Sequence, residues 1–215
     1  MTCPVSIDRV IVLHGYMASP SSHWFAWLRD ELAPEGVEVE IPALPNPTAP
    51  EPEAWITAAA KVLGEPDGRT AVVGHSLGCV TALHALDRLG GDWRLDALIA
   101  VSGFISPAPA LPELDPFIRA VPDIAGIAGN IRRRAIVRSD NDTFVTPSLT
   151  SELGRLLRAE EVVVPGAGHF RAAEGITSLS PRWPRSYSPE CVVPWPAGAV
   201  RLMPAGSEGR SPAAG

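Results

Sequence analysis

The stretch that decides the fold is residues 70–86, TAVVGHSLGCVTALHAL. It opens with a short apolar run, residues 71–74, of the kind that forms a buried parallel strand. Residues 76–89 then repeat their apolar positions at helical spacing. Between the two lies Gly-His-Ser-Leu-Gly, with Ser76 at its centre. A serine held at a tight strand-to-helix turn is typical of a nucleophile elbow, although glycine and serine are also common in ordinary turns.

The segments on either side repeat the alternation of strand and helix. Further strands are predicted at residues 10–13, 37–41, 95–101, 134–138 and 161–164, and helices near residues 23–32, 52–62 and 147–157. This alternation predicts an α/β fold: a single domain with a mainly parallel sheet of five or six strands and helices on both faces. Ser21 and Ser22 are expected to cap the first helix.

Two segments depart from this rhythm. Residues 103–130 are rich in proline, and both a short cap over a site and a plain excursion remain open for them. After residue 180 the periodicity stops and prolines recur. We therefore expect a domain of residues 1–180 followed by a poorly ordered tail, residues 181–215.

Composition excludes several classes of function. The 215 residues carry a net charge of −6 without a basic stripe, so no nucleic-acid partner is expected. No apolar stretch is long enough to span a membrane, and the N-terminal MTCPVSIDRV does not resemble a secretory signal. The three cysteines lie far apart, without metal or redox spacing, which favours a cytoplasmic protein with no metal or cofactor. The oligomeric state stays open.

An activated serine needs a base, and the base needs an acid. After a nucleophile elbow these residues follow the serine in the order acid, then histidine. His169 stands in VVVPGAGHF, just after the last predicted strand, and AIVRSDNDTFV supplies both Asp140 and Asp142 after the strand before it. All of these positions are carboxyl ends of strands, which is where open α/β sheets carry their sites.

The negatively charged oxygen of a tetrahedral intermediate needs two N–H donors. The elbow predicts the backbone amide of Leu77 as one of them. The loop after the first strand, LHGYMASP, predicts the amide of Tyr16 as the other.

Taken together, these segments resemble the small serine hydrolases of the retinoblastoma-binding protein 9 type, within the α/β-hydrolase superfamily. The resemblance rests on VIVLHGYMASPSSHWFAWL, VVGHSLGC, SDNDTFV and GAGHF followed by AAEG. It implies a single-domain α/β hydrolase in which Ser76 is the nucleophile, Asp142 the acid and His169 the base. The family usually has proline after the acid, whereas Thr143 stands here, so Asp140 remains the reserve candidate.

We therefore expect a serine hydrolase that cleaves an ester, thioester or amide of a small acyl group, with a small-molecule substrate as its partner. Two alternatives remain open at this stage. One is an acyltransferase that uses the same triad, and the other is a non-catalytic interaction protein on a hydrolase scaffold. His14 and His75 are expected to orient loops rather than to transfer protons.

Overall fold

A computed structural model describes residues 7–90 and 92–179 of the chain. These residues form one six-stranded sheet in the order β2-β1-β3-β4-β5-β6. The strands are β1 (Arg9–Leu13), β2 (Glu38–Glu40), β3 (Thr70–His75), β4 (Leu95–Val101), β5 (Ile131–Ser139) and β6 (Glu160–Val164). The α-helices are α1 (Phe25–Leu32), α2 (Pro52–Leu63), α3 (Leu77–Leu89), α4 (Ile124–Gly129) and α5 (Pro147–Leu157), and 3-10 helices occupy Ala33–Glu35, Pro112–Ile118 and Ala172–Glu174.

Every neighbouring pair of strands is parallel, which confirms the predicted α/β fold. All residues of the central strands β3 and β4 are buried, as expected for continuous apolar runs that helices cover on both faces. The short strand β2 lies at one edge and is partly exposed, in agreement with its alternation of valine and glutamate.

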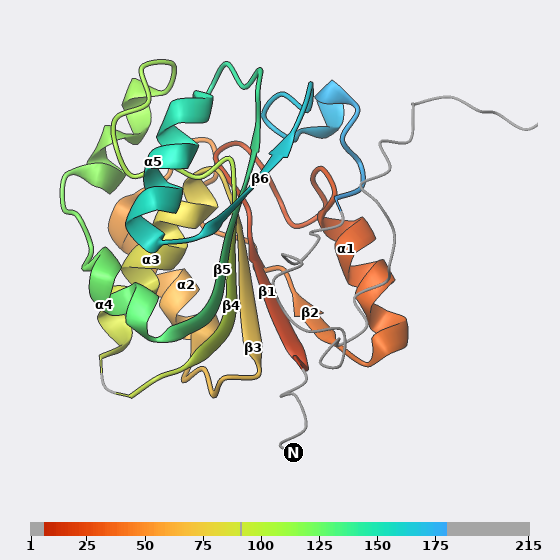
Figure 1. The fold of residues 1–215 in the computed structure, drawn as a ribbon, viewed down its shortest axis with the longest axis vertical. Coiled ribbons are helices and arrows are strands. Elements are labelled where there is room, and N and C mark those ends of the chain that lie inside the picture. Colours follow the sequence, from red (N-terminus) through yellow and green to blue (C-terminus); the bar gives the residue numbers. More distant parts are fainter. Residues whose placement is uncertain (1–6, 91, 180–215) are drawn as a thin grey trace, which may run out of the picture.

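Helices cover both faces of the sheet, as predicted. In Figure 1, α2, α3, α4 and α5 lie on one side of the sheet and α1 lies on the other. Each side has its own apolar core. The fully buried Trp55 belongs to the larger core beneath the four helices, and the fully buried Trp24 belongs to the core on the α1 side.

The predicted cap of the first helix is wrong. Helix α1 begins at Phe25, and its N-cap position is Trp24, whose side chain makes no capping hydrogen bond. The serines before it close a turn of their own, since Ser22 Oγ accepts a hydrogen bond from the Ser19 amide at 2.9 Å. A hydroxyl engaged in that turn is not available to cap a later helix.

Residues 103–130 form a packed extension of the larger core. They contain the 3-10 helix Pro112–Ile118 and helix α4, and both pack against α3. His84, in the middle of α3, donates a hydrogen bond from Nε2 to the Phe117 carbonyl oxygen at 2.8 Å. The predicted tail, residues 181–215, lies outside the described residues.

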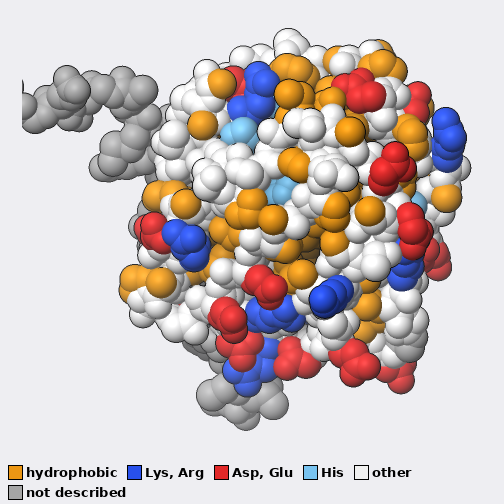
Figure 2. Space-filling view, turned by 180° about the vertical axis from the view of Figure 1, so that it is seen from behind, with side chains coloured by type: hydrophobic (Ala, Val, Ile, Leu, Met, Phe, Trp, Pro, Cys, Tyr) orange, Lys and Arg blue, Asp and Glu red, His pale blue; other side chains and the backbone are white. Residues whose placement is uncertain are grey.

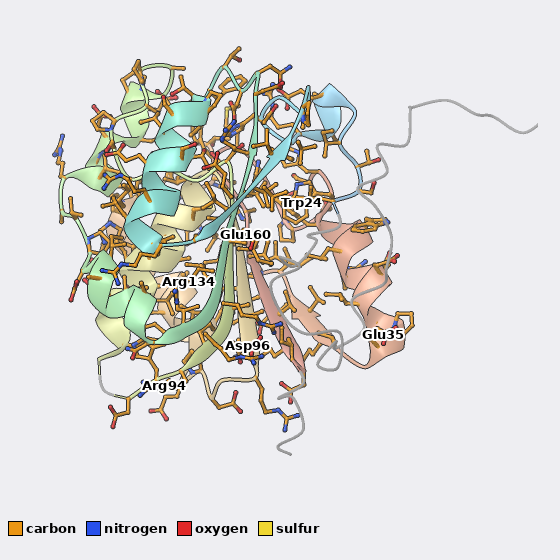
Figure 3. The ribbon with its side chains drawn as sticks, viewed as in Figure 1. Trp24, Glu35, Arg94, Asp96, Arg134 and Glu160 are labelled. Atoms are coloured by element: carbon orange, nitrogen blue, oxygen red, sulfur yellow. The ribbon has the colours of Figure 1, made fainter. Side chains whose placement is uncertain are left out.

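Charged side chains gather at the end of the sheet where the strands begin. Figure 2 shows them crowded along the lower edge of the molecule, and in Figure 3 the labelled Arg94 and Asp96 lie at that end. The fully buried Asp96 carboxylate forms ion pairs with Arg132 and Arg133. A depression of about 420 Å³ borders Arg94 and Asp96 there, at the opposite end of the sheet from Ser76. No helix in the described part of the chain is long and apolar enough to span a membrane.

Candidate functional site

The predicted elbow is present at the carboxyl end of β3. This strand ends at His75 and α3 begins at Leu77, so Ser76 alone makes the turn, with φ 54° and ψ −121°. A positive φ is strained for a residue with a Cβ atom and persists only where the surroundings hold it. The surroundings do so through two hydrogen bonds: the Ser76 amide donates to the Val101 carbonyl oxygen, and the Ser76 carbonyl oxygen accepts from the Cys79 amide, both at 2.9 Å.

The two glycines of the motif are required by close packing. A Cβ atom on Gly74 would lie 2.8 Å from the backbone of Cys79, in the first turn of α3. A Cβ atom on Gly78 would lie 2.1 Å from the carbonyl oxygen of Leu13, at the end of β1. The glycines therefore let α3 approach β3 and β1 closely enough to hold Ser76 above the sheet.

Substitution of Gly78 by alanine is expected to destabilise the fold by about 3 kcal/mol, because the new methyl group overlaps the Leu13 carbonyl and pushes α3 away from β1. Urea unfolding of the purified variants measures this. Gly129→Ala is the matched control. Gly129 is the exposed last residue of α4, and a Cβ atom there would meet nothing within 4 Å. The control should stay within about 1 kcal/mol of the parent protein. Equal unfolding midpoints for the parent and Gly78→Ala would contradict the packing argument.

A histidine and a carboxylate are paired at the neighbouring strand ends. His169, in the loop after β6, donates a hydrogen bond from Nδ1 to Oδ2 of Asp142 at 2.7 Å. Asp142 lies in the loop after β5, and its Oδ1 accepts hydrogen bonds from the amides of Phe144 and Val145 at 2.9 and 3.0 Å. His169 is 6% exposed and Asp142 is 5% exposed, so solvent weakens their interaction little. The carboxylate leaves Nε2 as the nitrogen of His169 that is free to exchange a proton.

Asp140 and Asp142 occupy different places in this loop. Asp140 accepts a hydrogen bond from the Gly166 amide at 2.8 Å, and Asn141 accepts one from the Gly168 amide at 2.8 Å. Both side chains therefore hold the backbone of the loop that carries His169, whereas Asp142 bonds to the imidazole ring itself.

Ser102 joins the same pair, and the sequence reasoning missed it. This residue follows β4, is fully buried, and donates a hydrogen bond from Oγ to Asp142 Oδ2 at 2.7 Å. Its backbone is also unusual, with φ 47°. The available signal was its position, since a serine directly after a buried strand ends at the same edge of the sheet as the predicted site.

The two predicted amide donors belong to segments that adjoin Ser76. Leu77 is the first residue of α3, so its amide has no acceptor within the helix. Gly15 brings the loop after β1 against the elbow, because a Cβ atom on Gly15 would stand 3.0 Å from that of Ser76. The next amide along this loop, that of Met17, donates a hydrogen bond to the Pro47 carbonyl oxygen at 2.8 Å. Within residues 7–90 and 92–179, the amides of Tyr16 and Leu77 make no hydrogen bond to another backbone group.

The carboxylate of Glu174 stabilises the loop that carries His169. Glu174 accepts hydrogen bonds from the amides of His169 and Arg171, at 2.9 and 3.0 Å, and forms an ion pair with the Arg171 side chain. Burial by itself would raise the pKa of Glu174, but the hydrogen bonds from Arg171 and His169 outweigh it and lower that pKa. Glu174 is therefore held as a carboxylate, and the loop backbone stays in place.

The remaining histidines near the site are neutral. Burial lowers the pKa of His14, whose Nδ1 donates to the Gly15 carbonyl oxygen while Nε2 accepts from the Leu44 amide. Burial, with a further contribution from the charge of His169, lowers the pKa of His23 to about 4. In the described part of the chain, no three His, Cys, Asp or Glu side chains are grouped to hold a metal ion.

The structure thus brings the predicted residues to one edge of the sheet. Ser76, Asp142 and His169 follow β3, β5 and β6, and the strand ends gather at the upper side of Figure 1. No hydrogen bond joins Ser76 Oγ to His169 in this structure. In unliganded active sites such contacts are often long and tighten only when substrate binds.

Comparison with known proteins assigns the chain to a family. The family model described as serine hydrolase matches residues 10–188. The chain belongs to the serine hydrolase family. Its relative YdeN of Bacillus subtilis (strain 168) is 36% identical over 171 residues, a stretch that covers 80% of this chain and 90% of YdeN. These matches confirm the predicted membership of a serine hydrolase family and the prediction of an enzyme.

Several solved structures share the fold. The crystal structure of the Bacillus subtilis ydeN product has a TM-score of 0.77 at 35% identity, covering 80% of this chain and 92% of that one. Est1E from Butyrivibrio proteoclasticus has a TM-score of 0.59 at 15% identity, with 78% and 82% covered. An esterase from Pyrococcus furiosus has a TM-score of 0.51 at 18% identity, with 74% of each chain covered. At such identities the last two structures are evidence for the fold alone.

Proposed function

We propose that this serine hydrolase cleaves an ester, thioester or amide of a small acyl group through Ser76, His169 and Asp142. The observation that carries the proposal is the buried pair of His169 and Asp142 at the same sheet edge as the strained elbow of Ser76. Because Ser76 is only 3% exposed, we expect the acyl group that reaches it to be small.

In the proposed reaction, Ser76 Oγ attacks the carbonyl carbon while its proton passes to Nε2 of His169. Asp142 keeps the other ring nitrogen protonated and stabilises the imidazolium that forms. His169 returns the proton to the leaving group as the bond to the acyl carbon breaks, which leaves an acyl ester on Ser76. Water then attacks this ester as it gives a proton to His169, and His169 passes that proton to Ser76 Oγ as the ester bond breaks, which releases the acid and the free serine.

The developing negative charge needs donors that are already in place. We assign this role to the amides of Tyr16 and Leu77, which belong to the two segments that adjoin Ser76 and make no hydrogen bond to another backbone group among the described residues. The N-terminus of α3 adds a favourable dipole at the same point. One such donor contributes on the order of 3 kcal/mol to the rate.

A fluorophosphonate probe tests the proposal, since it reacts with a serine only when the hydroxyl is activated. Trypsin is expected to release residues 70–88 as one peptide, in which Ser76 is the only serine. We expect mass spectrometry to find the probe on that peptide and p-nitrophenyl esters to be cleaved faster as their acyl chain is shortened. A label on another peptide would overturn the nucleophile, and a preference for long chains would overturn the small acyl group.

Two further parts of the proposal concern the acceptor and the compartment. Added alcohol should not divert the acyl group into a new ester, since an acyltransferase would form that ester in preference to the acid.

We also place the enzyme in the cytoplasm, because the buried thiol of Cys79 is free and the cysteines lie far apart in the sequence.

Substitution of Ser102 by alanine is expected to lower kcat about tenfold and to leave KM unchanged, because Asp142 loses one of the donors that orient its carboxylate. Steady-state kinetics with a short-chain ester measures both constants. Ser151→Ala is the matched control: its hydroxyl also donates to a carboxylate, that of Glu161 at 3.1 Å, but on α5. If the two variants have equal kcat, Ser102 does not orient Asp142.

A further inference from the structure

His75, the residue before Ser76, places a polar ring in the interior next to the site. It is 2% exposed, and its Nε2 lies 2.8 Å from the backbone carbonyl oxygen of His169. A carbonyl oxygen can only accept a hydrogen bond, so Nε2 carries the proton and donates it. This contact joins the elbow directly to the loop of the proposed base, 94 residues further along the chain.

The other ring nitrogen of His75 faces the loop after β1. Its Nδ1 is buried and has no hydrogen-bond partner among the described residues. A Cβ atom on Gly15 would stand 3.4 Å from this Nδ1. The ring of His75 therefore lies between two loops: the one that carries the Tyr16 amide and the one that carries His169.

The imidazole of His169 is enclosed by rings on two sides. Its centroid lies 5.1 Å from that of His75 and 5.4 Å from that of Phe144. On the other side of His75, the rings of His23, Phe25 and Trp24 pack at 5.2, 5.9 and 6.2 Å. In Figure 3, Trp24 lies between the sheet and α1, so this stack links α1 to the loop of His169. Because the two rings are in contact and the hydrogen bond joins the His75 ring to the His169 backbone, a displacement of the His75 ring would also displace His169.

The charge state of His75 suits a group that stands beside a base. Burial lowers its pKa well below the usual value, and positive charge on His169 or Arg171 lowers that pKa further, whereas the hydrogen bond to the His169 carbonyl oxygen opposes the shift without outweighing it. The other ionisable groups around the pair are Asp142, which bonds to His169, and Glu174, which holds the loop backbone. A neutral His75 does not repel His169 when the latter takes up a proton.

We propose that His75 is a positioning residue: through its Nε2–H bond to the His169 carbonyl, it holds the imidazole of His169 in register with Asp142 and Ser76. This inference rests on the proposed function, in which His169 is the base. It assigns to His75 no contact with substrate and no transfer of a proton.

A purely structural role predicts a different outcome. An unpaired buried nitrogen destabilises a fold, and an apolar side chain of similar volume in its place removes that penalty. Substitution of His75 by leucine removes the unpaired Nδ1 but also leaves the carbonyl oxygen of His169 without its donor, so the two effects on the melting temperature oppose each other. The deciding measurement is therefore the activity of each folded molecule, which should fall. If the ring served the fold alone, that activity would stay the same.

The test compares His75→Leu, which lacks the donor, with His75→Gln, whose longer amide can still donate to the His169 carbonyl. We expect His75→Leu to lower kcat by about 10- to 100-fold, because small displacements of a catalytic group are costly. KM should change by less than about twofold, since substrate binding does not involve the ring. His75→Gln should recover most of the lost kcat.

The chain offers a matched control in His84, which donates from Nε2 to the Phe117 carbonyl oxygen at the same 2.8 Å but in the middle of α3. His84→Leu and His84→Gln should both keep the parent kcat. If His75→Leu does not fold, His75→Asn replaces it, because its shorter amide does not reach the His169 carbonyl. A kcat of His75→Gln well above that of His75→Asn would then support the proposal, and equal values would overturn it.

The active-site concentration of every variant is measured with the fluorophosphonate probe. If the parent protein is not labelled on Ser76, the proposed function fails. If the parent is labelled and His75→Leu has the parent kcat, the proposed function stands and the role of His75 is overturned. Equal losses in His75→Leu and His75→Gln would also overturn it, since the hydrogen bond would then be irrelevant.

Discussion

Replacement of Ser76 by alanine is expected to lower kcat for a short-chain ester by about 10⁵- to 10⁶-fold, the loss seen when a triad nucleophile is removed. Oγ is the only non-hydrogen atom lost, and the residual rate would come from the donors and binding groups that remain. Active-site labelling and steady-state hydrolysis by the parent and the variant measure this effect.

The fold should survive this substitution. Alanine has a Cβ atom as serine does, so the strained backbone at φ 54° is unchanged, and the Ser76 amide and carbonyl keep their partners in Val101 and Cys79. Equal melting temperatures therefore serve as the control. Labelling of the alanine variant, or hydrolysis near the parent rate, would sink the assignment of Ser76.

Replacement of Asp142 by asparagine is expected to lower kcat by about 10⁴-fold, as for other triad acids. The carboxylate now accepts hydrogen bonds from four donors: His169 Nδ1, Ser102 Oγ and the amides of Phe144 and Val145. Asparagine has one oxygen and one N–H₂ group. If its oxygen stays with the two backbone amides, its N–H₂ faces His169 and forces the proton of that ring onto Nε2. His169 can then no longer accept the proton of Ser76.

Asp140→Asn is the matched control for Asp142→Asn. Asp140 accepts one hydrogen bond, from the Gly166 amide, and the oxygen of an asparagine can accept it equally well. We expect a loss in kcat of less than about tenfold for this variant, the effect of one weakened loop contact. A greater loss in Asp140→Asn than in Asp142→Asn would show that Asp142 is not the acid.

Much of the fold follows from local patterns in the sequence. The strand predicted at residues 95–101 and the helix predicted at residues 147–157 match β4 and α5 residue for residue. These predictions succeed because β-branched runs and helical spacing act within a short window of chain. The same reasoning is wrong at the cap of the first helix, because the Ser22 side chain bonds within its own turn and the helix begins at Phe25.

The candidate site likewise has parts that the sequence predicts and parts that it does not. The motif around Ser76 can be read from the sequence, because an elbow needs glycines at two fixed positions and a strand and a helix on either side. The choice between Asp140 and Asp142 cannot, because two carboxylates two residues apart satisfy the same pattern. Ser102 and His75 carry no motif that sets their partners, since those partners lie 40 and 94 residues away along the chain.

The sequence by itself determined the six strands and the four longer helices in their order along the chain, but not α4, and it placed the elbow at Ser76 and the catalytic candidates just after the ends of strands. Tertiary structure alone decided which side chains meet there. Parallel strands bring their carboxyl ends to one edge whatever their separation in sequence. Which carboxylate then reaches His169, and that His75 bonds to its carbonyl, depends on loop conformations held by contacts such as that between Glu174 and the His169 amide. Such contacts form only between distant segments of the folded chain, so no short window of sequence encodes them.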